Sequence, residues 1–230
     1  AAGVQVIDQC KALAIERDGQ RFRVRTAKGT VSARDVVLAT NGYSGPLSPW
    51  HRRRVIPIGS YIIATEPRDP TEMRKLIPHD RMVSDTRRVV FYYRLSPDQR
   101  SILFGGRVAY METNPLVSAP RLHKFMSAIF PTLKDAHVTH SWMGFVAYTF
   151  DTLPHVGKQD GIHYAMGYCG SGVSLATYFG MRIGQQVLGR AEGRTALDNV
   201  PFQTRPMYTG NPWFLAPSVW WYRMLDKLPI

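Results

Sequence analysis

The segment from residue 162 to residue 189 restricts the fold of this chain more than any other feature of its sequence. The apolar residues 162–166 predict a short strand, and the run GYCGSG at 167–172 predicts a tight turn. Residues 173–188 then predict a helix that ends at Gly189. A strand, a glycine-rich turn and a helix in this order are typical of a segment that faces a phosphate group or a cofactor. Small residues recur on one face of the helix, at Ala176, Gly180 and Gly184, and would let a sheet or a flat ligand come close.

The N-terminal part predicts a β-meander that leads into a buried strand. Strands are expected at 4–16, 21–26 and 30–40, with turn signals between them. The last strand ends in VVLAT, a run typical of a strand that is buried on both faces of a parallel sheet. The glycines of the NGYSG run at 41–45 permit positive φ angles or a close approach to a ligand.

The middle of the chain predicts an antiparallel sheet with helices on one side. The expected elements are strands at 54–66 and 137–149, a hairpin at 89–95 and 101–108, and helices at 70–77 and from 118–120 to Pro131. Asp69 precedes Pro70, as an N-cap precedes a proline at the first helical position. This pattern is typical of a substrate domain inserted into a larger fold.

Composition excludes several classes of protein. A hydrophobic fraction of 44% in 230 residues is enough to form a buried hydrophobic core, so the chain is expected to be globular. The apolar runs are far shorter than the roughly 20 residues of a membrane span, so we expect a cytoplasmic chain with no membrane partner. Cys10 and Cys169 lack the spacing of a disulfide framework or a zinc site. The net charge of +12 is scattered except at residues 51–54, so we expect no nucleic-acid partner.

The C-terminal tail, residues 196–230, is rich in proline and aromatic residues. Its large side chains are Trp213, Phe214, Trp220, Trp221 and Tyr222. We expect this tail to pack against the rest of the protein, because so many exposed aromatic side chains would promote aggregation.

Four segments follow one another in a recognisable order. They are VVLATNGY at 36–43, SILFGGR at 101–107, the stretch at 142–157, and MGYCGSGVS at 166–174. Together they resemble the FAD-dependent amine and amino-acid oxidoreductases of the D-amino-acid oxidase superfamily, most closely the gamma-glutamylputrescine oxidase-like proteins. The resemblance covers essentially the whole chain. It implies an α+β fold in which an incomplete, Rossmann-like FAD-binding portion with a β-meander is joined to an antiparallel-sheet substrate domain.

One part of the family pattern has no counterpart in this sequence. The resemblance implies an opening strand, a G-x-G-x-x-G turn and a helix that holds the FAD pyrophosphate. Gly170 and Gly172 match the first two glycines of this motif, but the third glycine is absent and the pair lies near the end of the chain. We therefore expect the C-terminal part of an enzyme that is inactive without the N-terminal segment. The strand at 36–40 would then lack parallel neighbours and favour a homo-oligomer or a complementing N-terminal chain.

The resemblance also implies which residues contact FAD. These are Thr40, Asn41, Gly42, Trp142, Gly144, Gly170, Ser171, Gly172 and Val173. The group at 170–173 begins a helix, whose positive N-terminal end would stabilise negative charge on the reduced flavin. Ordinary explanations remain open: residues 40–42 and 170–173 fit simple turns, and Trp142 fits core packing equally well.

Four further residues are expected to contact the substrate. Tyr61, Tyr92, Arg94 and Arg107 lie on strands that should face the flavin. Arginine can hold a carboxylate with two parallel hydrogen bonds, although strand arginines are also common as solvated charges. The sequence identifies no catalytic acid or base. His137 and His140 fall on opposite faces of a strand, so no metal site is expected.

The expected organisation has four parts. Residues 1–50 form a partial FAD-binding domain with the meander, 51–150 a substrate-binding domain, 151–195 a return to the FAD-binding domain, and 196–230 an aromatic tail. The first hypothesis is an FAD-dependent enzyme that oxidises the C–N bond of a small amine or amino acid to an imine. The alternative is a non-catalytic remnant that acts as an interaction or oligomerisation module. A basic nucleic-acid-binding protein, the third hypothesis, rests on charge alone.

Overall fold

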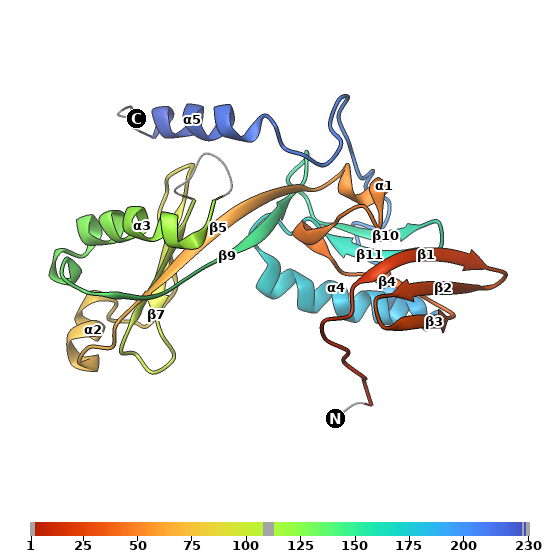
Figure 1. Ribbon diagram of the computed structural model, residues 1–230, viewed down its shortest axis with the longest axis horizontal. Coiled ribbons are helices and arrows are strands. Elements are labelled where there is room, and N and C mark those ends of the chain that lie inside the picture. The colour runs from red at the N-terminus through yellow and green to blue at the C-terminus, as the bar shows by residue number, and fades with distance from the viewer. Residues whose placement is uncertain (1–2, 108–112, 227, 229–230) are drawn as a thin grey trace. The chain divides into compact units, whose positions relative to one another are not determined.

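The computed structural model describes residues 3–107, 113–226 and 228 (Figure 1). The chain divides into two compact units, and each unit is built from two separate stretches of sequence. Unit 1 contains Ala1–Ile58 and Val146–Asn211, and unit 2 contains Gly59–Phe145 and Pro212–Ile230. Helices and antiparallel strands occur in both units, which confirms the expected α+β class.

The β-meander of unit 1 forms as expected but is shorter at both ends. It consists of β1 (Ala12–Asp18), β2 (Arg21–Thr26) and β3 (Gly29–Ala33), paired antiparallel in that order. The expected start at residue 4 was wrong. Val4 and Val6 alternate like strand residues, but both are exposed, so no part of the chain that the structure describes packs on them to hold this segment in a strand.

A second sheet of unit 1 contains β10 (His155–Gln159), β11 (Ile162–Met166) and β4 (Val37–Leu38), in the order β10-β11-β4. The expected single strand at 30–40 was therefore wrong, because β3 and β4 belong to different sheets. β4 pairs parallel with β11 and so has one parallel neighbour. Leu38 is 4% exposed whereas Val37 is 47% exposed, so β4 is buried on one face and not on both.

One long helix of unit 1 packs against this sheet, and the other helices of the unit are short. α4 (Gly172–Val187) follows β11 as expected, packs Phe179 and Ile183 against Val156 and Ala165, and ends before Gly189. Its small residues Ala176, Gly180 and Gly184 lie on the exposed side, away from the sheet. The shorter elements are α1 (Pro49–Arg52) and the 3-10 helices η1 (Asn41–Tyr43) and η3 (Ala191–Gly193).

Unit 2 is organised by a five-stranded sheet in the order β6-β7-β8-β5-β9. The strands are β5 (Ile56–Thr65), β6 (Val83–Ser84), β7 (Phe91–Leu95), β8 (Ile102–Gly106) and β9 (Val138–Tyr148). β7 and β8 form the expected antiparallel hairpin, whose predicted last residue, 108, lies outside the described residues. β5 pairs antiparallel with β8.

Two helices cover one face of this sheet, as the sequence predicts. α2 (Pro70–Leu76) is capped by the Asp69 side chain, which accepts a hydrogen bond from the backbone N–H of Thr71. α3 (Pro115–Ile129) begins earlier than expected, because Asn114 caps it at the backbone N–H of Leu116 and Pro120 lies inside the helix. The 3-10 helix η2 (Pro131–Leu133) follows. The core between helices and sheet includes Ile63, Met73, Leu95, Phe104, Leu122 and Met126.

The C-terminal tail packs only in part. Phe202 and Tyr208 are buried in unit 1. α5 (Leu215–Leu225) belongs to unit 2 and buries Val219. Four aromatic side chains that we expected to pack are exposed, namely Trp213, Trp220, Trp221 and Tyr222. Among the described helices, none has the length and apolar character needed to cross a membrane.

Candidate functional site

The glycine turn of unit 1 depends on unusual backbone angles. Gly167, Cys169 and Gly170 have φ values of +76°, +50° and +100°. A Cβ atom on Gly167 would lie 2.3 Å from Cγ2 of Thr149, so only glycine fits there. Gly170 has no neighbouring atom within 4 Å of the position a Cβ would take, so its surface is open. The turn is thus packed on one side and accessible on the other.

α4 begins directly after this turn with an uncapped N-terminus. Ser171 is the N-cap residue, but its side chain makes no capping hydrogen bond. The first backbone N–H groups of a helix have no partner within the helix and carry partial positive charge. Val173 is 95% exposed, so this end of the helix is open. Such an end can hold an anionic or electron-rich group against its N–H donors.

A second predicted segment, Thr40 to Gly42, is tied to the same turn. The Asn41 side chain accepts a hydrogen bond of 2.9 Å from the backbone N–H of Gly167, which lies 126 residues later in the sequence. Asn41 itself has a φ of +44°, a conformation that asparagine tolerates. Gly42 is buried. The structure therefore brings together two of the three segments that we expected to contact FAD.

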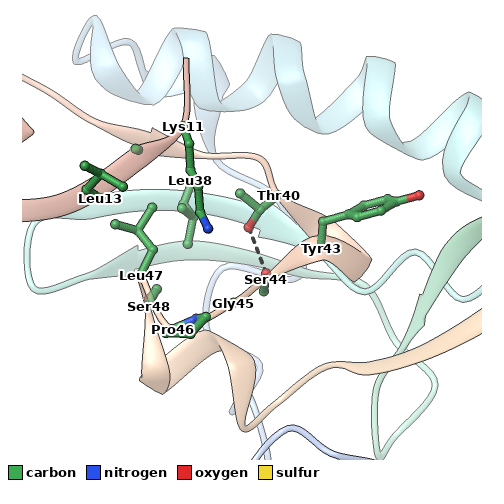
Figure 2. A pocket seen from close by; sticks show the side chains of 11 residues that line it. Lys11, Leu13, Leu38, Thr40, Tyr43, Ser44, Gly45, Pro46, Leu47 and Ser48 are labelled. Atoms are coloured by element: carbon green, nitrogen blue, oxygen red, sulfur yellow. Dashed lines mark hydrogen bonds between the residues drawn. The ribbon is translucent and has the colours of Figure 1, made fainter. Parts of the chain in front are cut away.

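A pocket of about 390 Å³ lies beside Thr40 (Figure 2). Its lining includes Lys11, Leu38, Thr40, Ser44 and Ser48. The Thr40 and Ser44 hydroxyl groups are 2.8 Å apart and share a hydrogen bond. In Figure 2 the Lys11 side chain reaches into this pocket, whereas the Tyr43 ring points away from it. The pocket offers a cation and hydroxyl groups on a largely apolar wall, as suits a polar ligand with an apolar part.

A buried hydrogen bond between His155 and Asp151 lies beside the turn and is linked to it through Thr149. His155 is almost fully buried, and its Nε2 lies 3.1 Å from both oxygens of Asp151. Burial raises the pKa of Asp151, but hydrogen bonds from His155 and from the backbone of Leu153 outweigh burial and lower the pKa. Thr149 donates to the backbone oxygen of Leu153 and contacts Cys169. Asp151 and His155 lie within the 142–157 stretch that carries the family resemblance, but the sequence analysis did not predict that they form a pair.

In unit 2, Tyr92 is held flat against the sheet. Its hydroxyl lies 2.7 Å from the Ser60 hydroxyl. A Cβ on Gly105 would fall 2.3 Å from the Tyr92 ring, so the ring occupies the space that the glycine leaves. Burial raises the pKa of Tyr92, so the phenol stays protonated at neutral pH and can donate a hydrogen bond. A glycine inside a strand is a general signal for such a close approach, although the sequence analysis did not use it at Gly105.

The other predicted substrate residues occupy different surroundings. Tyr61 is fully buried in the helix-covered core, and its hydroxyl accepts from the backbone N–H of Thr113. Arg94 is two residues from Tyr92 on β7 and therefore shares its face, where it is exposed. Arg107 is 8% exposed and donates to the backbone oxygen of Gly59. Tyr92 and Arg94 thus share the sheet face opposite the helices, while Tyr61 lies on the covered face.

Trp142 and Gly144 lie on β9, one of the two edge strands of this sheet. Met143 packs against the helix-covered core. Because side chains alternate along a strand, the Trp142 side chain points to the opposite face, the same face as Tyr92, and Gly144 is open on that face. Trp142 is 40% exposed and is not a core residue. Among the described residues, no group of His, Cys, Asp or Glu side chains could hold a metal ion.

Comparisons with known proteins identify the family to which the chain belongs. The family model described as "DAO: FAD dependent oxidoreductase" matches residues 1–186, so the chain belongs to this family of FAD-dependent oxidoreductases, as the sequence motifs predicted. The chain is 34% identical to a probable oxidoreductase OrdL of Rhizobium meliloti over 98% of this chain and 53% of that protein. It is 34% identical to the gamma-glutamylputrescine oxidoreductase of Escherichia coli over 90% of this chain and 49% of that protein.

Solved structures show the same fold at lower identity. The glycine oxidase from Geobacillus kaustophilus matches with a TM-score of 0.66 and 19% identity over 86% of this chain and 52% of that chain. The L-proline dehydrogenase from P. horikoshii matches with a TM-score of 0.65 and 18% identity over 94% and 56%. The chain therefore spans about half the length of the curated relatives it matches.

Proposed function

We propose that this chain contributes the flavin-facing turn and the substrate-facing sheet of an FAD-dependent oxidoreductase that oxidises the C–N bond of a small amine or amino acid to an imine. The observation that carries the proposal is the uncapped N-terminus of α4 behind an open glycine turn. FAD, when bound, accepts the hydride that leaves the carbon bearing the amine. The first N–H groups of α4 would stabilise the negative charge that results.

Each remaining residue has a role that follows from its surroundings. Gly170 and Gly172 give the cofactor close access to the backbone, and Asn41 fixes the turn through Gly167. We assign Thr40 and Gly42 to the adenosine half of FAD, and Trp142 and Gly144 to its ring. Tyr92, as a protonated phenol, can donate to the substrate, and Arg94 and Arg107 can pair with a substrate carboxylate. Tyr61 fits a structural role, since its hydroxyl is used inside the core.

We also propose that the chain needs the remainder of a full-length family member for turnover. The chain matches only about half of each curated relative. The outer face of α4 exposes Val173, Met181 and Leu188, and no atom lies within 4 Å of a Cβ built on Gly180 or Gly184. An apolar helix face of this kind suits burial against another protein surface. The same observation favours the second candidate function, a non-catalytic module that associates through α4.

A charge placed at the start of α4 tests the flavin site without weakening the helix. Val173→Asp puts a carboxylate where the flavin's negative charge would lie, while a carboxylate in the first turn favours the helix itself. Thr177→Asp, one turn further, carries the same charge and is the matched control. We expect Val173→Asp to weaken FAD binding at least about tenfold in equilibrium dialysis, given the strength of charge-assisted contacts, and Thr177→Asp to leave it near the wild-type value.

The outcomes separate the two candidate functions. Equal FAD affinity in both variants contradicts the assignment of the turn. A protein that stays colourless after incubation with excess FAD in the presence of the remaining half, followed by gel filtration, supports the association module. Amine-dependent peroxide formation by the chain alone contradicts the requirement for the remaining half, whereas peroxide formation only after addition of that half supports it.

A further inference from the structure

The Tyr92 side chain lies across the five-stranded sheet of unit 2 instead of standing away from it. Tyr92 on β7 pairs with Gly105 on β8, and β8 separates β7 from β5. A Cβ on Gly105 would lie 2.3 Å from Cε2 of Tyr92 and 2.8 Å from its hydroxyl oxygen. The ring therefore extends over the glycine in the direction of β5, through space that any other residue at position 105 would fill.

Ser60 on β5 meets the far end of this ring. Its hydroxyl oxygen lies 2.7 Å from the Tyr92 hydroxyl oxygen, a normal length for a hydrogen bond between two hydroxyl groups. Tyr61 packs in the helix-covered core, so by alternation its neighbour Ser60 faces the other side of the sheet, as Tyr92 does. The hydrogen bond thus joins two strands that are separated by a third.

The two hydroxyl groups keep one proton for a ligand. Each group carries one proton, and the hydrogen bond between them uses one of the two. Within the part of the chain that the structure describes, neither hydroxyl has a second hydrogen-bonding partner. Burial raises the pKa of Tyr92 and the hydrogen bond with Ser60 lowers it, with burial the larger effect. At neutral pH the pair can therefore donate one hydrogen bond from the sheet face opposite the helices.

We propose that Ser60 is a positioning residue for the substrate: its hydroxyl holds the Tyr92 ring over Gly105 and so fixes the point from which the phenol contacts the substrate. The proposal rests on the proposed function, in which Tyr92 donates to the substrate. Without this anchor the Tyr92 side chain can adopt other staggered rotamers. A group displaced by about 1 Å can slow a reaction on the order of a hundredfold, so the anchor matters for turnover.

NMR of the chain with carbon-13 in its tyrosine rings tests the anchor without flavin or turnover. Tyr92→Phe assigns the Tyr92 signals. In the wild type, the Tyr92 ring protons should show a nuclear Overhauser effect to the α-protons of Gly105, and the phenol should titrate above the usual pKa of tyrosine. Ser60→Ala should weaken the Overhauser effect and move the titration to still higher pH, because the hydroxyl that lowers the pKa is lost.

A conservative variant and a matched control separate the anchor from a general effect of the sheet. Ser60→Thr keeps the hydroxyl and should restore both the Overhauser effect and the titration. Ser84 is the cross-strand neighbour of Tyr92 on the other side, on β6, and is exposed. Ser84→Ala should therefore leave both signals as they are in the wild type. The Overhauser effect of the wild type needs no substitution, so the test remains valid even if a variant fails to fold.

Kinetics carry the test to the substrate. In the enzyme assembled from the chain and the remaining half, the probes are glycine and methylamine, the simplest amino acid and the simplest alkylamine. Ser60→Ala should raise the KM of the oxidised probe about twofold to tenfold, the value of one hydrogen bond. In the Tyr92→Phe background, Ser60→Ala should leave KM unchanged, because Ser60 acts through Tyr92.

Four results would overturn the proposal. The first is a wild-type chain without the Overhauser effect between Tyr92 and Gly105. The second is a Ser60→Ala chain whose Tyr92 signals match the wild type, and the third is a Ser84→Ala chain that changes them as much as Ser60→Ala does. The fourth is an equal rise in KM on Ser60→Ala with and without the Tyr92 hydroxyl. The NMR results do not depend on FAD, so they distinguish a failure of this proposal from a failure of the proposed function.

Discussion

Replacing Asn41 by alanine should destabilise unit 1 by two separable effects. The first is the loss of the acceptor for the Gly167 N–H, a buried donor whose desolvation without a partner costs about 1–3 kcal/mol. The second is the φ of +44° at position 41, which costs an alanine about 1 kcal/mol. The sum predicts a loss of about 2–4 kcal/mol in the free energy of unfolding.

Two further substitutions distinguish these effects. Asn41→Asp keeps an acceptor oxygen and tolerates the left-handed backbone, so we expect the smallest loss. Asn41→Gly removes the acceptor but accommodates the positive φ, so it should lie between aspartate and alanine. From most to least stable, the expected order is wild type, Asn41→Asp, Asn41→Gly and Asn41→Ala.

Urea unfolding followed by circular dichroism measures the order, and amide exchange at Gly167 measures the hydrogen bond itself. The Gly167 amide should exchange faster in the Gly and Ala variants but not in the Asp variant. If Asn41→Ala is as stable as the wild type, the hydrogen bond does not hold the turn. If Gly and Ala are equally stable, the backbone argument is wrong and the acceptor accounts for the whole effect.

Three other predictions concern stability. Burial, followed by the nearby Arg54, lowers the pKa of His51 from 6.5 to about 4, so the folded state favours the neutral ring. The free energy of unfolding should be highest above pH 6.5 and should fall by about 3 kcal/mol as the pH decreases toward 4, measured by urea unfolding at each pH. His51→Phe should make the free energy of unfolding less dependent on pH in this range. Gly105→Ala should lower stability by about 1–3 kcal/mol, because its Cβ would overlap the Tyr92 ring, and thermal unfolding of Gly105→Ala/Tyr92→Ala should recover part of the loss. Asp69→Ala should cost about 1 kcal/mol in the same assay through loss of the cap on α2, with Asp69→Asn, which keeps an acceptor, near the wild type.

Local signals in the sequence predicted the local structure well. The cap at Asp69, the β7–β8 hairpin and the run from β11 through the glycine turn into α4 all depend on residues that are close in sequence. Their geometry is fixed by turn chemistry and by apolar spacing, which can be read without knowledge of distant partners.

Features that depend on distant partners were not predicted. The exposed Val4 and Val6 alternate like strand residues, but no strand among the described residues pairs with them. The 30–40 run is divided because β4 pairs with β11, more than a hundred residues later. Tyr61 and Tyr92 both look like substrate residues in sequence, and only the register with β8 shows that they point to opposite faces.

The interleaving of the two units has a consequence for folding during synthesis. Unit 1 is complete only when Val146–Asn211 has been added, and unit 2 only when Pro212–Ile230 has followed. The meander and Asn41 leave the ribosome long before Gly167 and β11 exist to receive them. The β4 segment of the nascent chain therefore has no β11 to pair with while more than a hundred further residues are synthesised. An unpaired strand edge is prone to aggregation, so chaperone binding would be most useful during this interval.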